Sequence, residues 1–245
     1  MEENKHTAAA YVPPQMAPYK RTAWLPLTEE GDGGVTDSKF AGTPWLGESE
    51  EWPRCPNCGE PIQLFLQLNL ARLPEPVRGE YGEGLLQLFY CTNAESQCEV
   101  KCEAFFPFSR SVVVRLVSPS GETNAAPAPE IVEAFPPRLI VGWREADDYP
   151  NWDEGSLSGV ELEEAEWESL EEEGYPRPGD KLAGWPHWIQ GVEYPDCPTC
   201  GERMRLVFQI DSRDNLPFDF GDVGCSHVTQ CPTHKDVLAF GWACS

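Results

Sequence analysis

The sequence predicts a mainly β protein, a β-rich α+β fold made of two homologous, internally duplicated units. Three observations predict it. Short apolar or alternating segments are separated by turn residues, the 245-residue chain contains 24 prolines and 21 glycines, and one segment occurs twice. Hydrophobic residues make up 40% and charged residues 24% of the chain, which is typical of a folded, soluble protein.

Six segments are expected to form strands, because each is short, apolar or alternating, and bounded by Gly, Pro or Asp. They are 63–70, 85–91, 111–117, 138–143, 204–210 and 237–242. We also expect strands at 102–108, which is aromatic, and at 224–231. One acidic helix is expected at 160–173, where good helix formers end before Gly174, a suitable residue after a helix C-terminus.

The repeated segment is the most informative feature of the chain. Residues 38–69 align without a gap with residues 180–211, and thirteen of the 32 positions are identical. The period is far longer than that of solenoid repeats, so it predicts a doubled domain and not a stack of repeats. The predicted organisation is a flexible tail at 1–20, a first repeat unit at 21–117, a linker at 118–137 and a second repeat unit at 138–245.

Each unit contains a CPxCGE segment, which is typical of a zinc-knuckle hairpin. Two cysteines separated by two residues can reach one metal from a tight turn, and the glycine that follows permits a positive φ. A structural zinc ion needs four ligands in a tetrahedron. In the second unit, Cys231 and His234 complete a Cys3His set with Cys197 and Cys200.

The first unit has one knuckle and a later cysteine, Cys91, that matches Cys231 in position. Its fourth ligand is Cys98 or Cys102, and counting back from the aromatic residues that close both units favours Cys98. The sequence therefore predicts two structural zinc ions. The eight expected ligands are Cys55, Cys58, Cys91 and Cys98 in the first unit, and Cys197, Cys200, Cys231 and His234 in the second.

The ten cysteines could also form disulfides or take part in redox chemistry. The N-terminus lacks the apolar core of a secretion signal, and no apolar stretch approaches the roughly 20 residues of a membrane span. We therefore expect a cytoplasmic, reducing location, where cysteines indicate metal or redox chemistry more than disulfides. No thioredoxin-like βαβ pattern surrounds the CxxC pairs, which argues against redox chemistry. Iron in place of zinc is a further possibility.

The motifs of the repeat resemble those of a known family. The pattern KxxGxP, followed by CPxCG, a strand containing Gln67 or Gln209 and a later FxC, resembles the bacterial YwqG-like family of unknown function. It is also similar to the eukaryotic programmed-cell-death-protein-two and Tsr four proteins. Residues 39–70, 84–106 and 181–245 carry this resemblance. It implies a duplicated, strand-rich domain, with Trp45, Gln67 and Gln209 on a shared surface.

The charge of the chain restricts its partners. It contains 41 acidic and 18 basic residues, which give a formal net charge of −23 and a pI near 4.4. Such a charge repels phosphate backbones and attracts basic proteins. Residues 161–173 contain eight glutamates, which form either a solvated helix face or a docking site for a basic peptide. The tryptophans that flank the GxP motifs serve either in packing or in peptide binding; they are Trp45, Trp52, Trp185 and Trp188.

No nucleophile, metalloprotease, phosphate-loop or dinucleotide motif is present in the sequence. The eukaryotic relatives named above act as chaperones of a ribosomal protein, which suggests a similar role. We therefore predict a non-catalytic, zinc-supported protein-binding module that chaperones or neutralises a basic protein client. Nucleic acid and membranes are not expected partners. The alternative is a metal-dependent hydrolase that uses the second zinc site, with Cys225 or His227 nearby.

Overall fold

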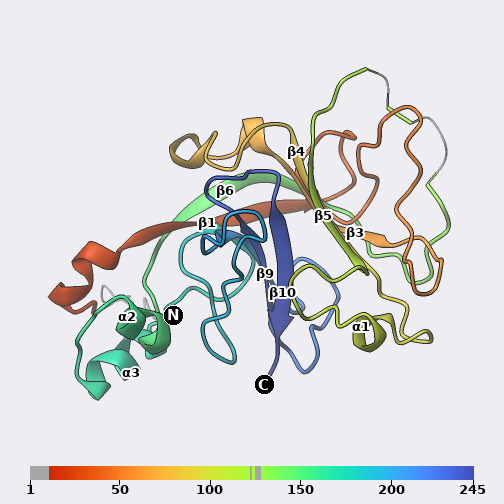
Figure 1. Ribbon diagram of the computed structural model, residues 1–245. Helices are drawn as coiled ribbons and strands as arrows, with labels where there is room; N and C mark the ends of the chain where they lie inside the picture. Colours follow the sequence, from red (N-terminus) through yellow and green to blue (C-terminus); the bar gives the residue numbers. More distant parts are fainter. Residues whose placement is uncertain (1–10, 122, 125–127) are drawn as a thin grey trace, which may run out of the picture.

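The computed structural model describes residues 11–121, 123–124 and 128–245, and it shows one antiparallel sheet of ten strands (Figure 1). Residues 1–10 of the predicted tail and four residues of the predicted linker lie outside the described residues. The strands are β1 (Arg21–Glu30), β2 (Lys39–Phe40), β3 (Gln63–Asn69), β4 (Leu85–Tyr90), β5 (Val112–Val117), β6 (Arg138–Asp148), β7 (Lys181–Ala183), β8 (Arg205–Asp211), β9 (Cys225–Gln230) and β10 (Leu238–Ala243). The helices are α1 (Cys98–Lys101), α2 (Trp152–Leu157) and α3 (Glu164–Glu172), with short 3-10 turns at Pro14–Tyr19, Leu70–Arg72 and Glu75–Val77.

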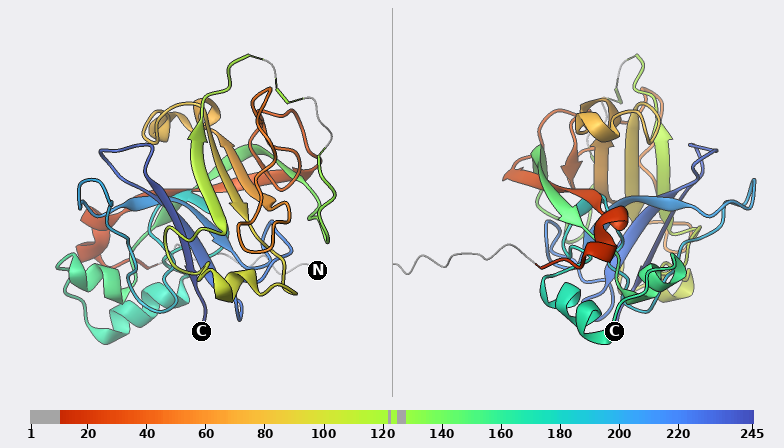
Figure 2. Two further views of the ribbon diagram at one scale, coloured as in Figure 1. Left: turned by 45° about the vertical axis from the view of Figure 1, so that its right-hand side comes forward. Right: turned by 90° about the vertical axis from the view of Figure 1, so that its left-hand side faces the viewer.

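The strands are ordered β10-β9-β8-β7-β1-β6-β2-β3-β4-β5. From each edge inwards, four strands follow in reverse chain order, β10 to β7 on one side and β5 to β2 on the other. The first strand, β1, lies between β7 and β6, among strands of the second half of the chain. Strand β6, in turn, pairs with β2 of the first half. The sheet curls until its edge strands β5 and β10 lie side by side (Figures 1 and 2).

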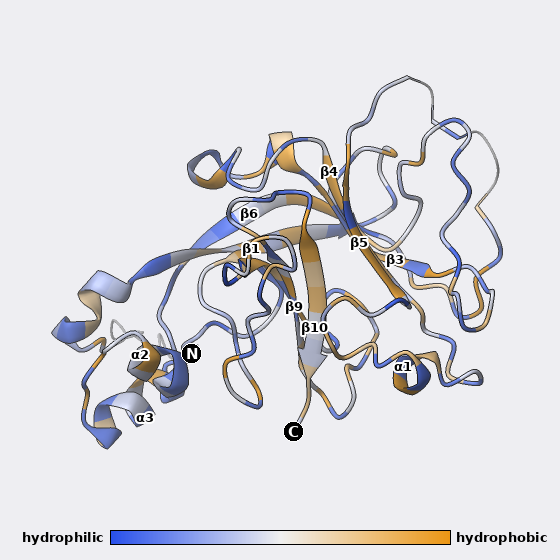
Figure 3. Cartoon of the chain, viewed as in Figure 1, coloured by the Kyte–Doolittle hydropathy of each residue, from blue (hydrophilic) through white to orange (hydrophobic). Residues whose placement is uncertain are grey.

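Both halves of the chain contribute to one hydrophobic core inside the curled sheet. Strands β3, β4 and β9 are buried along almost their whole length, and β3 and β4 are largely apolar (Figure 3). Phe65 of β3 lies 5.1 Å, between ring centroids, from Phe218 of the second half. Tyr90 of β4 lies 5.7 Å from Phe240 of β10 and accepts a hydrogen bond from the indole of Trp242 at 3.0 Å. The predicted mainly β class is confirmed.

A lysine of each KxxGxP motif is completely buried and paired with an aspartate. The Lys39 ammonium lies 2.6 Å from Asp32, and the Lys181 ammonium lies 2.9 Å from Asp148. Burial lowers the pKa of Lys181, although the charge of Asp148 opposes that shift. Losing one partner of the Lys181–Asp148 pair, in which both side chains are fully buried, costs about 3–5 kcal/mol, because the other charge is left unpaired.

The glycine of the motif allows this aspartate to approach the chain. Gly42 and Gly184 have φ values of 80° and 78°, which side chains rarely adopt. A Cβ atom on Gly42 would lie 2.3 Å from the carboxylate of Asp32, and one on Gly184 would lie 2.4 Å from that of Asp148. The motif therefore encodes a buried lysine paired with an aspartate and the close backbone turn that accommodates that aspartate.

The two glutamines that follow the CPxCG motifs are buried, so the expected shared surface of Trp45, Gln67 and Gln209 is wrong. The carbonyl oxygen of the Gln67 side chain accepts a hydrogen bond from the backbone of Trp45 at 3.0 Å. That of Gln209 accepts one from the backbone of His187 at 2.8 Å. Each glutamine thus provides a hydrogen-bond acceptor for a backbone N–H of the residue that follows the GxP motif.

Two local predictions differ from the structure. The segment 102–108 is a series of turns and not a strand, because Glu103 and Phe108 adopt positive φ values and Pro107 lacks a backbone donor. The strand that closes the first half is β5. The acidic helix begins at Glu164 instead of residue 160, because a capping box of Glu163 and Glu166 sets its start. No helix in the described part of the chain is long and apolar enough to cross a membrane.

Candidate functional sites

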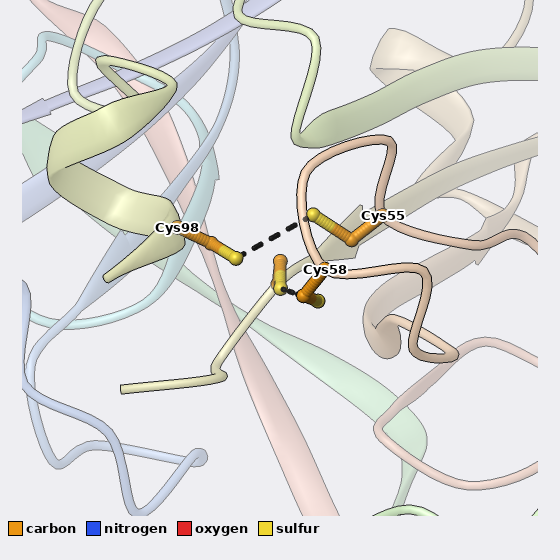
Figure 4. A group of neighbouring side chains, drawn as sticks. Cys55, Cys58 and Cys98 are labelled. Atoms are coloured by element: carbon orange, nitrogen blue, oxygen red, sulfur yellow. Dashed lines mark hydrogen bonds between the residues drawn. The ribbon is translucent and has the colours of Figure 1, made fainter. Parts of the chain in front are cut away.

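The first candidate metal centre joins Cys55, Cys58, Cys91 and Cys98, whose sulfur atoms all lie within 4.8 Å of one another. Cys55 and Cys58 lie on one turn, and Figure 4 shows the sulfur of Cys55 facing that of Cys98 at the start of α1. The Cys55 and Cys98 sulfur atoms are 3.7 Å apart, and those of Cys58 and Cys91 are 3.8 Å apart. Three of the four residues are buried and Cys58 is partly exposed.

The second candidate centre joins Cys197, Cys200, Cys231 and His234, again within 4.8 Å of one another. The Cys200 and Cys231 sulfur atoms are 3.6 Å apart. The Nδ1 atom of His234 lies 3.9 Å from the Cys197 sulfur and 3.7 Å from that of Cys231. The backbone N–H of His234 also donates to the Cys231 sulfur at 3.2 Å.

The CPxCGE turn has the same backbone hydrogen bonds in both centres. The N–H of Cys55 donates to the carbonyl of Glu60 at 2.9 Å, and the N–H of Gly59 donates to the carbonyl of Cys55 at 2.8 Å. The corresponding bonds of Cys197 and Gly201 have the same lengths. Gly59 and Gly201 adopt φ values of 76° and 71°, as the motif predicts. This turn places both of its sulfur atoms on one side.

The spacing of the donor atoms suits a tetrahedral ion. Four thiolates at a Zn–S distance of about 2.3 Å lie roughly 3.8 Å from one another. The observed sulfur–sulfur contacts of 3.6 to 3.8 Å match this edge length. Four sulfur donors, or three with one imidazole, are the donor sets of structural zinc sites. The residues present therefore fit a zinc ion in each group.

The electrostatics of the second group also favour a cation. Burial opposes ionisation of Cys197, but hydrogen bonds from the backbone of Cys200 and Thr199 outweigh it and lower the pKa of Cys197 to about 6. A backbone hydrogen bond favours the Cys200 thiolate, yet burial and the neighbouring thiols raise its pKa to about 11. The Cys197 thiolate thus forms readily, and its negative charge disfavours ionisation of Cys200. A divalent cation bound between the sulfur atoms would relieve this repulsion.

The remaining cysteines lie outside both groups. Cys102, the alternative fourth ligand of the first unit, follows α1 and belongs to neither group. Cys225 is buried in β9, where its sulfur lies 3.8 Å from Nε2 of His227. Burial raises the pKa of the Cys225 thiol well above its ordinary value. All ten cysteines are free thiols.

A groove of about 580 Å³ lies over α2 and α3, and it is lined by carboxylates and aromatic side chains. Glu164, Glu168 and Glu171 are spaced to lie on one face of α3, and Asp153 comes from α2. The aromatic side chains that line it are Trp152, Trp167, Tyr175 and Trp188. Trp152 is 60% exposed, which is unusual for a side chain of this size.

The acidic groups of this groove form no ion pair with the described part of the chain. Of the ion pairs among the described residues, none includes a carboxylate of α3 or Asp153. The last turn of α3 contains no basic residue, although the negative end of the helix dipole lies there. Of the four tryptophans that flank the GxP motifs, for which packing and peptide binding are the alternatives, only Trp188 lines the groove. Trp45 and Trp185 are buried in packing.

Comparison with protein families places the chain. Residues 38–230 match the family model described as a domain of unknown function, DUF1963. The chain belongs to this family. The DUF1963 region contains the first cysteine group, Cys197 and Cys200, and all the residues that line the acidic groove. Cys231 and His234 follow directly after it.

A curated relative shares only part of the DUF1963 chain. The uncharacterized protein YpfL of Salmonella typhimurium strain LT2 is 31% identical over 58 residues. The shared stretch covers 24% of this chain and 13% of YpfL.

Proposed function

We propose that this DUF1963 protein is a non-catalytic binding protein, supported by two structural zinc ions, that captures a basic segment of a client protein. The observation that carries the proposal is the groove over α2 and α3, which combines four unpaired carboxylates with aromatic walls. Lysine and arginine side chains are attracted both to carboxylates and to aromatic faces. A basic peptide segment therefore complements both components of the groove.

The zinc component of the proposal rests on the donor sets. Cys55, Cys58, Cys91 and Cys98 hold the first ion, and Cys197, Cys200, Cys231 and His234 hold the second. Structural zinc sites of this kind contribute about 10–16 kcal/mol of apparent binding free energy, which is comparable to the stability of a whole domain. Each ion thus fixes a CPxCGE turn to the end of a neighbouring strand. The turns precede β3 and β8, and the strands β4 and β9 end just before the ligands Cys91 and Cys231.

An internal duplication accounts for the paired features. The two strand orders β5-β4-β3-β2 and β10-β9-β8-β7 correspond. Each half has one CPxCGE turn, one buried lysine of the KxxGxP motif, and a buried glutamine, Gln67 or Gln209, at the matching position. In the proposed organisation, the units span 21–117 and 138–245, joined by a linker and preceded by a tail. The same duplicated arrangement is expected of a relative of the YwqG-like and programmed-cell-death-protein-two families. A cytoplasmic location, which is reducing, is part of the proposal and agrees with ten free cysteines.

Binding of a labelled Lys/Arg-rich peptide, measured by fluorescence anisotropy at low and high salt, tests the client proposal. We expect saturable binding that weakens as salt rises, because the attraction is between exposed charges. A composition-matched acidic peptide should not bind. If the basic peptide shows no saturable binding at low salt, the proposal is wrong.

Two triple variants of equal charge separate the groove from general acidity. The first replaces the groove carboxylates of α3, and the second replaces exposed glutamates of the same segment that do not line the groove. They are Glu164→Gln, Glu168→Gln and Glu171→Gln in the first, and Glu161→Gln, Glu172→Gln and Glu173→Gln in the second. Only the first should weaken binding by more than about tenfold. Equal weakening would show that net charge alone attracts the peptide.

Elemental analysis of the purified protein tests the metal sites. We expect about two zinc ions per chain, and iron in their place would identify the alternative metal. Cys197→Ser should remove one ion, whereas Cys225→Ser, which changes an equally buried cysteine outside both groups, should remove none. A metal-free protein that is fully folded would refute this part of the proposal. Four protein donors complete each tetrahedron, so we do not propose the hydrolase.

A further inference from the structure

We propose a second binding site, of opposite charge to the acidic groove, that takes a small organic phosphate monoester. The site is a cavity of about 620 Å³ between β1, β7 and the start of β8 on one side and residues 76–81 on the other. Arg21, Arg203 and Arg205 all line it. The cavity shares no lining residue with the acidic groove, so this proposal does not depend on the peptide proposal.

The gathering of three arginines is notable in a chain with only 18 basic residues against 41 acidic ones. Within the described residues, none of the three forms an ion pair with a carboxylate. Arg21 donates to the backbone carbonyl of Gly184 at 3.4 Å and also hydrogen-bonds the side chain of Tyr194, and Arg205 donates to the backbone carbonyl of Glu80 at 3.0 Å. None of these partners is a carboxylate. The positive charge of the cavity is therefore available to a ligand.

Aromatic rings hold the guanidinium groups in place. The guanidinium carbon of Arg21 lies 3.2 Å from the ring centroid of Trp185. That of Arg203 lies 5.4 Å from the ring of Tyr194, and that of Arg205 lies 5.8 Å from the ring of Tyr81. Contact with a ring restrains a guanidinium and leaves its N–H edges free to donate.

Two buried donors in the lining have no acceptor. The Nε atom of Arg205 and the Nε1 atom of Trp24 are buried and lack a hydrogen-bond partner among the described residues. Both residues line the cavity, and both atoms can only donate. Buried donors without partners are rare in native proteins. An oxygen-rich anion is the ligand that would satisfy them.

The number of arginines favours a phosphate over a carboxylate. A carboxylate has two oxygens, whereas a phosphate monoester has three non-bridging oxygens that can accept from several guanidinium groups at once. Two acidic residues also line the cavity: Glu80, which is exposed, and Glu154, whose carboxylate accepts from the indole of Trp188 at 2.8 Å. The three arginines outnumber these two carboxylates, so the lining keeps a net positive charge that favours an anion. The cavity volume is that of a metabolite-sized site, and Trp24 and Tyr81 provide apolar wall.

Calorimetric titration with phenyl phosphate, inorganic phosphate and benzoate tests the proposal on the full chain. We expect phenyl phosphate to bind most tightly and benzoate to bind at least about tenfold more weakly. Arg205→Gln should weaken phenyl phosphate binding about ten- to hundredfold, whereas Arg110→Gln, an equal charge change at an exposed residue outside the cavity, should not. Equal binding of benzoate, or equal effects of the two variants, would overturn the proposal.

An NMR measurement on the unaltered protein keeps the proposal testable if Arg205→Gln does not fold. Phenyl phosphate should shift the indole N–H resonance of Trp24, assigned by its disappearance in Trp24→Phe. The indole of Trp45, which does not line the cavity, should not shift. If phenyl phosphate leaves the Trp24 resonance unchanged at saturating concentration, the site does not bind phosphate monoesters.

Discussion

The substitution Gly184→Ala tests the explanation of the KxxGxP motif. An added Cβ would lie 2.4 Å from Oδ2 of Asp148 and 2.9 Å from the Cβ of Ala23. The carboxylate of Asp148 is fully buried and accepts hydrogen bonds from the ammonium of Lys181 at 2.9 Å and from the backbone of Trp185 at 2.8 Å. It cannot move away without breaking these bonds.

The expected loss of stability has two parts. A side chain at the left-handed φ of 78° costs about 1–2 kcal/mol. Displacing Asp148 leaves Lys181 without its partner, which costs about 3–5 kcal/mol. Gly184→Ala should therefore lower the free energy of unfolding by about 4–7 kcal/mol, a large part of the 5–15 kcal/mol typical of a whole protein.

Urea unfolding followed by tryptophan fluorescence measures this loss. Gly159→Ala is a matched control, because Gly159 has a φ of 82° and nothing within 4 Å of an added Cβ, so only the first part applies. Gly42→Ala should fall between the two, since its partner Asp32 is 36% exposed and can turn into solvent. Equal losses for Gly184→Ala and Gly159→Ala would show that the buried carboxylate plays no part in the requirement for glycine.

Three further predictions concern single residues. Cys98→Ser should remove one bound metal ion per chain and Cys102→Ser none, measured by elemental analysis; the reverse result would reassign the fourth ligand. Gly59→Ala should cost only about 1–2 kcal/mol in urea unfolding and retain both ions, because an added Cβ meets nothing within 4 Å. Burial, reinforced by the charge of Lys181, lowers the pKa of His227 to about 3. The unfolded chain takes up a proton below about pH 6.5 and the folded chain does not, so this histidine makes stability fall by up to about 4 kcal/mol between pH 6.5 and pH 3. In urea unfolding across that range, His227→Phe should fall less steeply than the unaltered protein, and parallel curves would contradict the assignment.

The cysteine groups could be predicted from the sequence because their chemistry is local. The spacing in CPxCG determines a turn, and a turn of that kind presents two sulfur atoms on one side whatever the rest of the chain does. The choice of Cys98 over Cys102 needed only alignment of the two halves. The structure brings together the eight residues that the sequence selected, and elemental analysis tests the metal content proposed for them.

The surface sites could not be predicted in the same way, since they depend on distant segments. Arg21 reaches the ring of Trp185 only because β1 pairs with β7. Trp152 lines the acidic groove because the short helix α2 packs beside α3; Asn151, which accepts from the backbone of Glu154 as a helix cap, was the one local signal of α2. The segment 102–108 was predicted to be a strand for its aromatic residues, but its Phe105 carbonyl instead accepts from the backbone of Trp242 at the edge of β10.

The first strand of each proposed unit, β1 or β6, pairs with strands of the other unit, and this pairing determines whether the two units can unfold independently. Strands β1 and β6 lie outside the repeated segments, and they pair along their whole length, with opposite charges at both ends: Arg21 faces Asp148, and Glu30 faces Arg138. Each of the two strands also completes the sheet of the other half, through β7 and β2. Separating the halves would expose strand edges and divide one core. Loss of either metal ion should therefore destabilise the whole chain in a single transition, and not one unit alone.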